Sequence, residues 1–239
     1  MESLSILLLD RQRPRATHGA DITYPCKQAV MPLLHELSEE AETVGAVNTV
    51  HFSAGRRVGY NTDAWGFEES FRHGLRGASL THVVQVGAGG AGAATAFALL
   101  RLGVRCLSII DTDFERALSL AGNLAQHFEN PDVSAVRDRD LAQVLAGAAG
   151  IVNSTPMGME KHPGSAVPAG LLRADLWVAD IVYFPIETQL LRAARAAGCR
   201  TLDGGGMVVY QAARAFEIFT GRTADSTRMR ERFETTIAT

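Results

Sequence analysis

A glycine-rich hexapeptide between a predicted strand and a predicted helix is the clearest candidate for chemistry in this chain. It reads Gly87-Ala88-Gly89-Gly90-Ala91-Gly92, directly after the apolar residues 83–86 and before the small-residue segment 93–100. In such a turn the backbone comes close to a pyrophosphate, and the helix N-terminus supplies unpaired N–H donors and a positive dipole end. The hexapeptide predicts a dinucleotide site, but taken alone it also fits a plain β–α connection.

An acidic residue at the end of the next predicted strand supports the dinucleotide interpretation. Residues 106–110 form that strand, and Asp111 follows it, about 20 residues beyond the glycine turn, where an acid accepts hydrogen bonds from the ribose hydroxyls of NAD. The same carboxylate repels the 2′-phosphate of NADP, although Arg116, one helical turn further on, reduces that repulsion. The pattern favours NAD over NADP.

Lys27 and Asp63 are the polar residues outside this segment that could catalyse a reaction. Lys27 follows Pro25, which stiffens the chain before a predicted helix, and Asp63 ends the segment 59–63. Oxidation of an alcohol by a nicotinamide needs a group that accepts the hydroxyl proton, and a lysine held by a carboxylate can do this. The alternative is a surface lysine and an aspartate that caps a helix.

The elements that must position these residues alternate between strand and helix. After the glycine turn, strands are predicted at 106–110, 133–136, 150–153, 177–182 and 200–202, and helices at 114–128, 141–145, 188–197, 208–220 and 226–237. This order predicts an α/β fold, a Rossmann-type doubly wound parallel sheet.

A smaller α/β substrate domain is predicted before the glycine turn. Apolar residues recur at helical spacing over 28–43, and Gly45 ends that helix. Strands at 48–52 and 57–60 form a hairpin, and a helix capped by Asp63 follows. The domain boundaries that we expect are 1–78 for the substrate domain, 79–204 for the dinucleotide-binding domain and 205–239 for C-terminal helices that pack back on the first.

Composition and charge exclude several classes of protein. The formal net charge of −3 gives no basic surface for nucleic acid, and no run of Lys or Arg suggests a membrane surface. No apolar stretch approaches the roughly 20 residues needed to span a bilayer. Three well-separated cysteines predict free thiols and a cytoplasmic location, and seven isolated histidines predict no metal site.

Seven segments resemble, in order, the motif series of the shikimate/quinate dehydrogenases. They are GADITYPCK at 19–27, GAVNT at 45–49, GYNTDAWG at 59–66, VGAGGAG at 86–92, NSTPMGM at 153–159, DIVY at 180–183 and LDGGGM at 202–207. The resemblance implies reversible oxidation of shikimate or quinate, a small polyhydroxy cyclic acid, by hydride transfer to NAD(P). Asp111 resembles the NAD-preferring quinate/shikimate branch.

The resemblance implies roles for individual residues. Lys27 and Asp63 match the catalytic acid/base pair. The positions that match substrate contacts are Thr23, Asn48, Tyr183 and Gln211. The positions that match cofactor contacts of the family are Gly87, Ala88, Gly89, Gly90 and Ala91 of the glycine turn, with Asp111, Thr155, Met157, Gly206 and Met207. Thr23 and Asn48 could instead be turn residues, and Met207 could belong to the core.

Two departures from the family pattern concern the substrate site. Only 26 residues precede Lys27, and Ser3-Leu4-Ser5 is followed by Ile6 where the carboxylate-binding element of the family has Pro. We therefore expect a truncated substrate domain with an exposed sheet edge, and we transfer no role to these serines. Asp21 stands where the family usually has Asn.

These departures leave two functions open. The first is an NAD-dependent shikimate/quinate dehydrogenase, with a homodimer as one expected assembly. The second is a non-catalytic relative that binds NAD beside an incomplete substrate site. A methylenetetrahydrofolate dehydrogenase is excluded by the motifs Asn61-Thr62-Asp63 and Asp203-Gly204 together.

Overall fold

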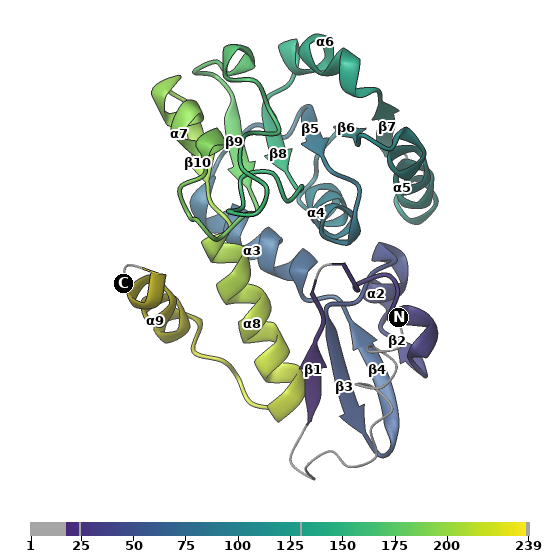
Figure 1. Cartoon of the computed structure of the whole chain (residues 1–239). Coiled ribbons are helices and arrows are strands. Elements are labelled where there is room, and N and C mark those ends of the chain that lie inside the picture. Colours follow the sequence, from purple (N-terminus) through teal and green to yellow (C-terminus); the bar gives the residue numbers. More distant parts are fainter. Residues whose placement is uncertain (1–17, 24, 130, 238–239) are drawn as a thin grey trace.

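Two β-sheets organise the chain in the computed structural model, which describes residues 18–23, 25–129 and 131–237 (Figure 1). The larger sheet has the strand order β10-β9-β8-β5-β6-β7, and every neighbouring pair is parallel. Its strands are β5 (Val83–Val86), β6 (Cys106–Ile110), β7 (Asp132–Val136), β8 (Gly150–Asn153), β9 (Trp177–Asp180) and β10 (Arg200–Leu202). The strand order reverses at β5, so a crevice for a ligand is expected at the carboxyl ends of β5 and β8. The predicted Rossmann sheet is confirmed.

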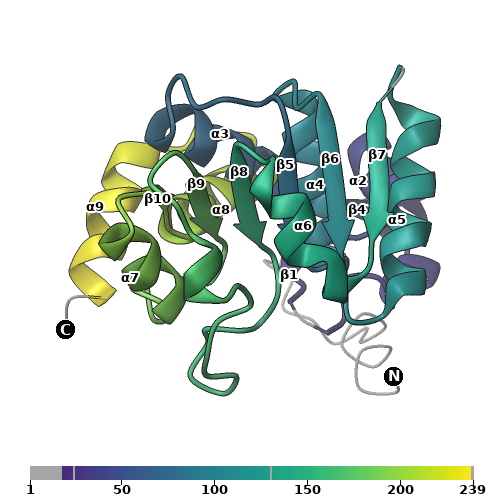
Figure 2. The ribbon, with the colours of Figure 1, turned by 90° about the horizontal axis from the view of Figure 1, so that it is seen from above.

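Helices cover both faces of this sheet (Figure 2). On one face lie α3 (Asp63–Gly74), α4 (Gly90–Arg101) and α5 (Phe114–His127), and on the other α6 (Leu141–Ala146) and α7 (Gln189–Ala196). Short 3₁₀ turns, η2 (Asp138–Asp140) and η3 (Ala169–Leu171), lie in the connections. The fold is thus a three-layer arrangement with the sheet in the middle.

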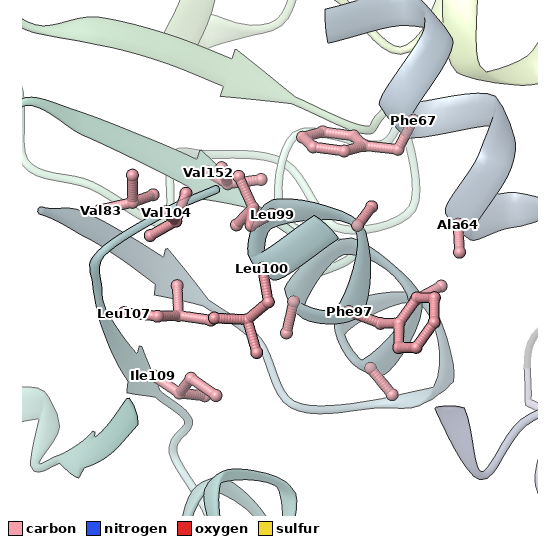
Figure 3. Close-up of a cluster of buried hydrophobic side chains, with 14 of the residues drawn as sticks. Ala64, Phe67, Val83, Phe97, Leu99, Leu100, Val104, Leu107, Ile109 and Val152 are labelled. Carbon is pink, nitrogen blue, oxygen red and sulfur yellow. The ribbon is translucent and has the colours of Figure 1, made fainter. Parts of the chain in front are cut away.

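The centre of the core lies around α4, which is rich in alanine and packs between the sheet and α3. Figure 3 shows Leu99 and Leu100 of α4 pointing toward Val83 and Leu107 of the sheet, while Phe67 of α3 covers the other side. Full burial of a leucine side chain contributes about 2 kcal/mol. The helix that begins in the glycine turn is therefore anchored along its length.

The smaller sheet has the order β1-β3-β4-β2. Its strands are β1 (Gly19–Asp21), β2 (Glu36–Leu37), β3 (Thr49–Ser53) and β4 (Arg56–Tyr60). The predicted hairpin is confirmed: Ala54 and Gly55, with φ of 48° and 77°, form the two-residue turn between β3 and β4. Within the part of the chain that the structure describes, β1 is an edge strand and pairs with β3.

The single helix predicted over residues 28–43 is wrong. The structure instead has the 3₁₀ turn η1 (Met31–Leu33), strand β2 and the short helix α2 (Glu39–Val44). Pro32 donates no backbone hydrogen bond, Leu34 is extended, and His35 N donates to Arg57 O of β4 at 2.9 Å. Pairing with the sheet therefore overrides the helical spacing of the apolar residues. Gly45 ends α2 with a positive φ of 68°, as predicted.

Two C-terminal helices follow the large sheet, and the first of them extends to the small sheet (Figure 1). The first, α8 (Gly205–Thr220), packs along α3 and reaches β1, where the Phe219 ring lies against Gly19. The second, α9 (Ser226–Ile237), returns to the start of α8. Among the described residues, no helix is long and apolar enough to cross a membrane.

Candidate functional site

Lys27 and Asp63 lie together, although 36 residues separate them in the sequence. Lys27 Nζ is 2.5 Å from Asp63 Oδ2, and the two side chains are 16% and 7% exposed. Thr62 occupies the position before α3 and Asp63 is the first helical residue, so the prediction that Asp63 caps the helix is wrong. Its carboxylate instead accepts hydrogen bonds from Lys27 Nζ and Asn48 Nδ2.

Asn48 connects this ion pair to two further polar side chains. Asn48 Nδ2 donates to Asp63 Oδ1 at 3.0 Å and to Thr62 Oγ1 at 2.9 Å, and Asn48 Oδ1 accepts from Thr62 N at 2.7 Å. Gln211 Oε1, from α8, lies 3.3 Å from both Asn48 Nδ2 and Thr62 Oγ1. Thr62 was not predicted as a site residue, although it stands beside Asp63 in the same motif. The network fixes the orientation of the Asp63 carboxylate.

A glycine of α3 allows Gln211 to reach this network. A Cβ at Gly66 would lie 2.7 Å from Met207 O and 2.8 Å from Gln211 N. These atoms belong to the backbone of α8 and cannot rotate away. The close approach of α3 and α8 therefore depends on the missing side chain at position 66.

Two other predicted substrate residues are outside this network. Thr23 is exposed, and its carbonyl oxygen accepts a hydrogen bond from Cys26 N at 2.9 Å in the turn before Lys27. Tyr183 follows β9 and is 47% exposed. Ser3 and Ser5 lie outside the described residues.

Asp21 adds a second carboxylate near the ion pair. Partial burial and the charge of Asp63 raise the pKa of Asp21 above its ordinary value. The amide that the family usually has at this position would carry no such charge. Asp21 therefore makes the surroundings of Lys27 more acidic than the family pattern implies.

The glycine turn has the geometry of a dinucleotide cradle. Gly87 has a φ of 107°, and a Cβ at Gly92 would lie 2.2 Å from Gly87 O, so both positions require glycine. The Gln85 amide holds the turn closed by donating to Gly87 O and Gly92 O. A Cβ at Gly89 would meet no atom within 4 Å, which leaves open space at the N-terminus of α4. The turn thus fits a pyrophosphate.

Asp111 is bound directly to this turn. Its Oδ2 accepts from Ala88 N at 2.8 Å, and its Oδ1 accepts from Asp113 N at 2.9 Å. The carboxylate retains lone pairs for further donors. The structure therefore brings the predicted ribose-binding acid to the predicted pyrophosphate turn.

The two predicted sites meet at Lys27. A Cβ at Gly90 would lie 3.1 Å from Lys27 Cβ, so the lysine side chain packs against the start of α4. The glycine turn and the ion pair are therefore neighbours, as a hydride transfer between cofactor and substrate requires.

The remaining predicted cofactor residues lie in two other segments. Thr155 Oγ1 donates to Asn153 Oδ1 at 2.7 Å and accepts from Met157 N at 3.1 Å. Gly206 packs against Ser70. Met207 is 7% exposed and belongs to the hydrophobic core cluster, which agrees with the alternative interpretation of Met207 as a core residue. A surface cavity of about 430 Å³ near Phe184 and Arg192 contains none of the predicted site residues.

Comparison with known proteins identifies the family. A family model described as the shikimate dehydrogenase substrate binding domain matches residues 5–50, and one described as the shikimate 5′-dehydrogenase C-terminal domain matches residues 204–232. A shikimate dehydrogenase (NADP(+)) of Streptomyces avermitilis is 54% identical over 211 residues, which are 88% of this chain and 72% of that protein. The chain belongs to the shikimate/quinate dehydrogenase family. This confirms the resemblance seen in the sequence.

Other members of the family agree. A quinate/shikimate dehydrogenase (NAD(+)) of Corynebacterium glutamicum is 50% identical over 227 residues, 95% of this chain and 80% of that protein. The structure of a Corynebacterium glutamicum quinate dehydrogenase in complex with NAD has a TM-score of 0.88 and 47% identity, and the match covers 98% of this chain and 82% of that one. A Thermus thermophilus shikimate 5-dehydrogenase in complex with NADP(H) and shikimate has a TM-score of 0.80 and 34% identity, with 98% and 82% covered. The family therefore consists of NAD(P)-dependent oxidoreductases, while its members differ in the cofactor.

Proposed function

We propose that this chain catalyses the reversible oxidation of shikimate to 3-dehydroshikimate or of quinate to 3-dehydroquinate. The observation that carries the proposal is the 2.5 Å ion pair between Lys27 and Asp63, which packs against Gly90 of the dinucleotide turn. A partly buried lysine–carboxylate pair beside the cofactor turn places a proton acceptor next to the hydride acceptor, which favours the enzyme over a non-catalytic relative.

The cofactor and the residues of the site have separate roles in this reaction. NAD(P) supplies the hydride acceptor for oxidation and the donor for reduction. Lys27 Nζ, when unprotonated, takes the proton of the reacting hydroxyl as the ketone forms, and returns it in the reverse direction. Asp63 holds Nζ in place, and Asn48 orients Asp63. Gln211, Thr23 and Tyr183 are proposed to contact the other hydroxyl groups and the walls of the substrate pocket.

Turnover by the full chain is the direct test. Purified protein given NAD together with quinate or shikimate should produce NADH, followed by its absorbance. The same protein should bind NADH in a fluorescence titration without any acid. NADH binding without turnover of either acid would establish the non-catalytic alternative for this chain.

We infer that the cofactor is NAD in preference to NADP. Asp111, bound to Ala88 N of the turn, supports this preference because a carboxylate at the ribose repels a 2′-phosphate. The relatives include enzymes with either cofactor, so the preference depends on this residue. The cytoplasmic location, the homodimer and the domain boundaries stay predictions from the sequence.

Replacement of Asp111 by Ala should narrow the difference between the two cofactors. We expect kcat/KM for NAD to fall about tenfold, because about 1.4 kcal/mol of hydrogen bonding to the ribose is lost, while kcat/KM for NADP rises. The ratio of the two values, measured with one acid substrate, checks this. The exposed Asp138→Ala is the matched control, and an unchanged ratio in the Asp111 variant would remove Asp111 from the selection of cofactor.

A further inference from the structure

A buried carboxylate that the proposed reaction does not use lies at the carboxyl edge of the large sheet. Asp180 ends β9, opposite Asn153 of β8, and is 1% exposed. Three donors converge on it. Asn153 Nδ2 and Val182 N bind Oδ1 at 2.9 Å and 3.1 Å, and Thr188 Oγ1 binds Oδ2 at 2.7 Å.

Two of the three donors belong to segments with predicted site residues, and the third caps a helix. The Asn153 side chain also accepts from Thr155 Oγ1 and donates to Met157 O at 3.0 Å. Val182 precedes Tyr183. Thr188 accepts from Leu191 N at 3.2 Å and so caps α7.

The loop that follows Met157 is packed on the same carboxylate. A Cβ at Gly158 would lie 3.8 Å from Asp180 Oδ2 and 3.3 Å from the Thr188 side chain. Asp180 accepts hydrogen bonds from both Asn153 and Thr188 and so joins the segments 153–158 and 182–191, which also pack on each other at Gly158 and Thr188.

We propose that Asp180 is a positioning residue that holds segment 153–158 against segment 182–191, so that Thr155 and Met157 are placed to bind NAD(P), and that its protonation weakens this binding. The inference rests on the proposed cofactor contacts of Thr155 and Met157. Asp180 itself touches no reacting atom in this scheme; it acts through Asn153 and Thr188.

Asp180 takes up a proton within the pH range in which binding can be measured. Burial raises the pKa of Asp180 to about 6, and the hydrogen bonds from Thr188, Val182 and Asn153 only partly oppose this. Above that pH the carboxylate accepts all three hydrogen bonds. As the pH falls through about 6, one oxygen takes up a proton and becomes an O–H donor, so it loses its negative charge and its hydrogen bond from the donor beside it weakens.

Other titratable or charged groups on the packed segments must be separated from Asp180. The loop after Met157 carries Glu160, Lys161 and His162, and His162 O accepts from Gly158 N at 2.8 Å. On the other side, Glu187 pairs with Arg195 at 2.6 Å and accepts at its carbonyl from Arg192. None of these contributes to the shift at Asp180.

NADH binding, followed by fluorescence without any acid substrate, tests the proposal. For the unaltered chain we expect the Kd to rise about three- to tenfold as the pH is lowered from about 8 to about 5, which corresponds to one lost hydrogen bond. Asp180→Asn resembles the protonated side chain, so it should show the weak binding at both ends and no step near pH 6. Thr188→Val removes a hydrogen bond to the ionised form and should move the step to higher pH.

The control is His162→Gln, which should keep the step of the unaltered chain. A flat profile in the unaltered chain, an unchanged profile in Asp180→Asn, or loss of the step in His162→Gln would overturn the proposal. Thermal melting of each variant at both pH values shows whether the variant is folded. If Asp180→Asn does not fold, the shift of the step in Thr188→Val still tests the proposal. Because no acid is present, the result does not depend on whether the chain is a dehydrogenase, and an inactive chain that shows the step would refute the proposed function alone.

Discussion

Replacement of Lys27 by Ala will lower kcat for quinate or shikimate by about 10³-fold, the range of general acid–base catalysis, and leave the Kd for NADH within about twofold. The reacting hydroxyl then has no group to receive its proton, while the glycine turn is unchanged. Steady-state kinetics and an NADH titration measure the two effects. Lys27→Arg is the sharper variant, because guanidinium keeps the charge beside Asp63 but does not release a proton. It should fold normally and be equally inactive.

The composition of the chain offers a matched control for this experiment. Lys161 is the only other lysine in the sequence. Lys161→Ala should keep full activity, since its side chain is exposed and lies outside the proposed site. A Lys27 variant that retains more than about a tenth of kcat would show that another group moves the proton.

Replacement of Gly66 by Ala will lower the free energy of unfolding by about 2 kcal/mol and raise the KM for the acid substrate more than it changes the Kd for NADH. The added methyl group would lie 2.7 Å from Met207 O and 2.8 Å from Gln211 N, so α8 must move away from α3. Gln211 then leaves the network of Asn48 and Thr62. Chemical denaturation and substrate kinetics measure the two consequences.

Gly122→Ala is the control for the Gly66 variant. Gly122 also lies inside a helix, but a Cβ there would meet no atom within 4 Å, so alanine should stabilise the chain by about 0.5 to 1 kcal/mol. If Gly66→Ala were equally stabilising and kept its KM, the helices would tolerate separation and Gln211 would have no role in substrate binding.

The fold was predictable from the sequence wherever local pattern and tertiary structure agree. The alternation of short apolar runs and helical segments after Val83 predicted the parallel sheet, and the paired positive-φ residues Ala54 and Gly55 formed the expected hairpin turn. The prediction of a helix over residues 28–43 was wrong because part of this segment forms β2 at the edge of the small sheet, although its apolar residues recur at helical spacing. Leu37, for example, lies in β2 and pairs with Gly59 of β4, whereas the predicted helix would have placed it in a helical turn.

The site was predictable only in its parts. Motif order identified Lys27, Asp63, Asn48 and Gln211, but no local pattern joins Asn48 to a residue 163 positions away. That contact depends on the crossing of α3 and α8 at Gly66, which is a property of three dimensions. The role of Asp180 was hidden for the same reason, because its partners Asn153 and Thr188 come from different segments of the chain.

The contact between Lys27 and Gly90 joins the cofactor site to the substrate site and so bears on how the affinities for the two ligands depend on each other. Because the lysine side chain packs against the first residue of α4, a shift of that turn toward Lys27 on cofactor binding would also displace Lys27. Linkage then requires reciprocity: if bound cofactor alters the affinity for the acid by some factor, bound acid alters the affinity for the cofactor by the same factor. Cooperativity between the cofactor and the acid would thus depend on the contact between the Lys27 Cβ methylene group and Gly90.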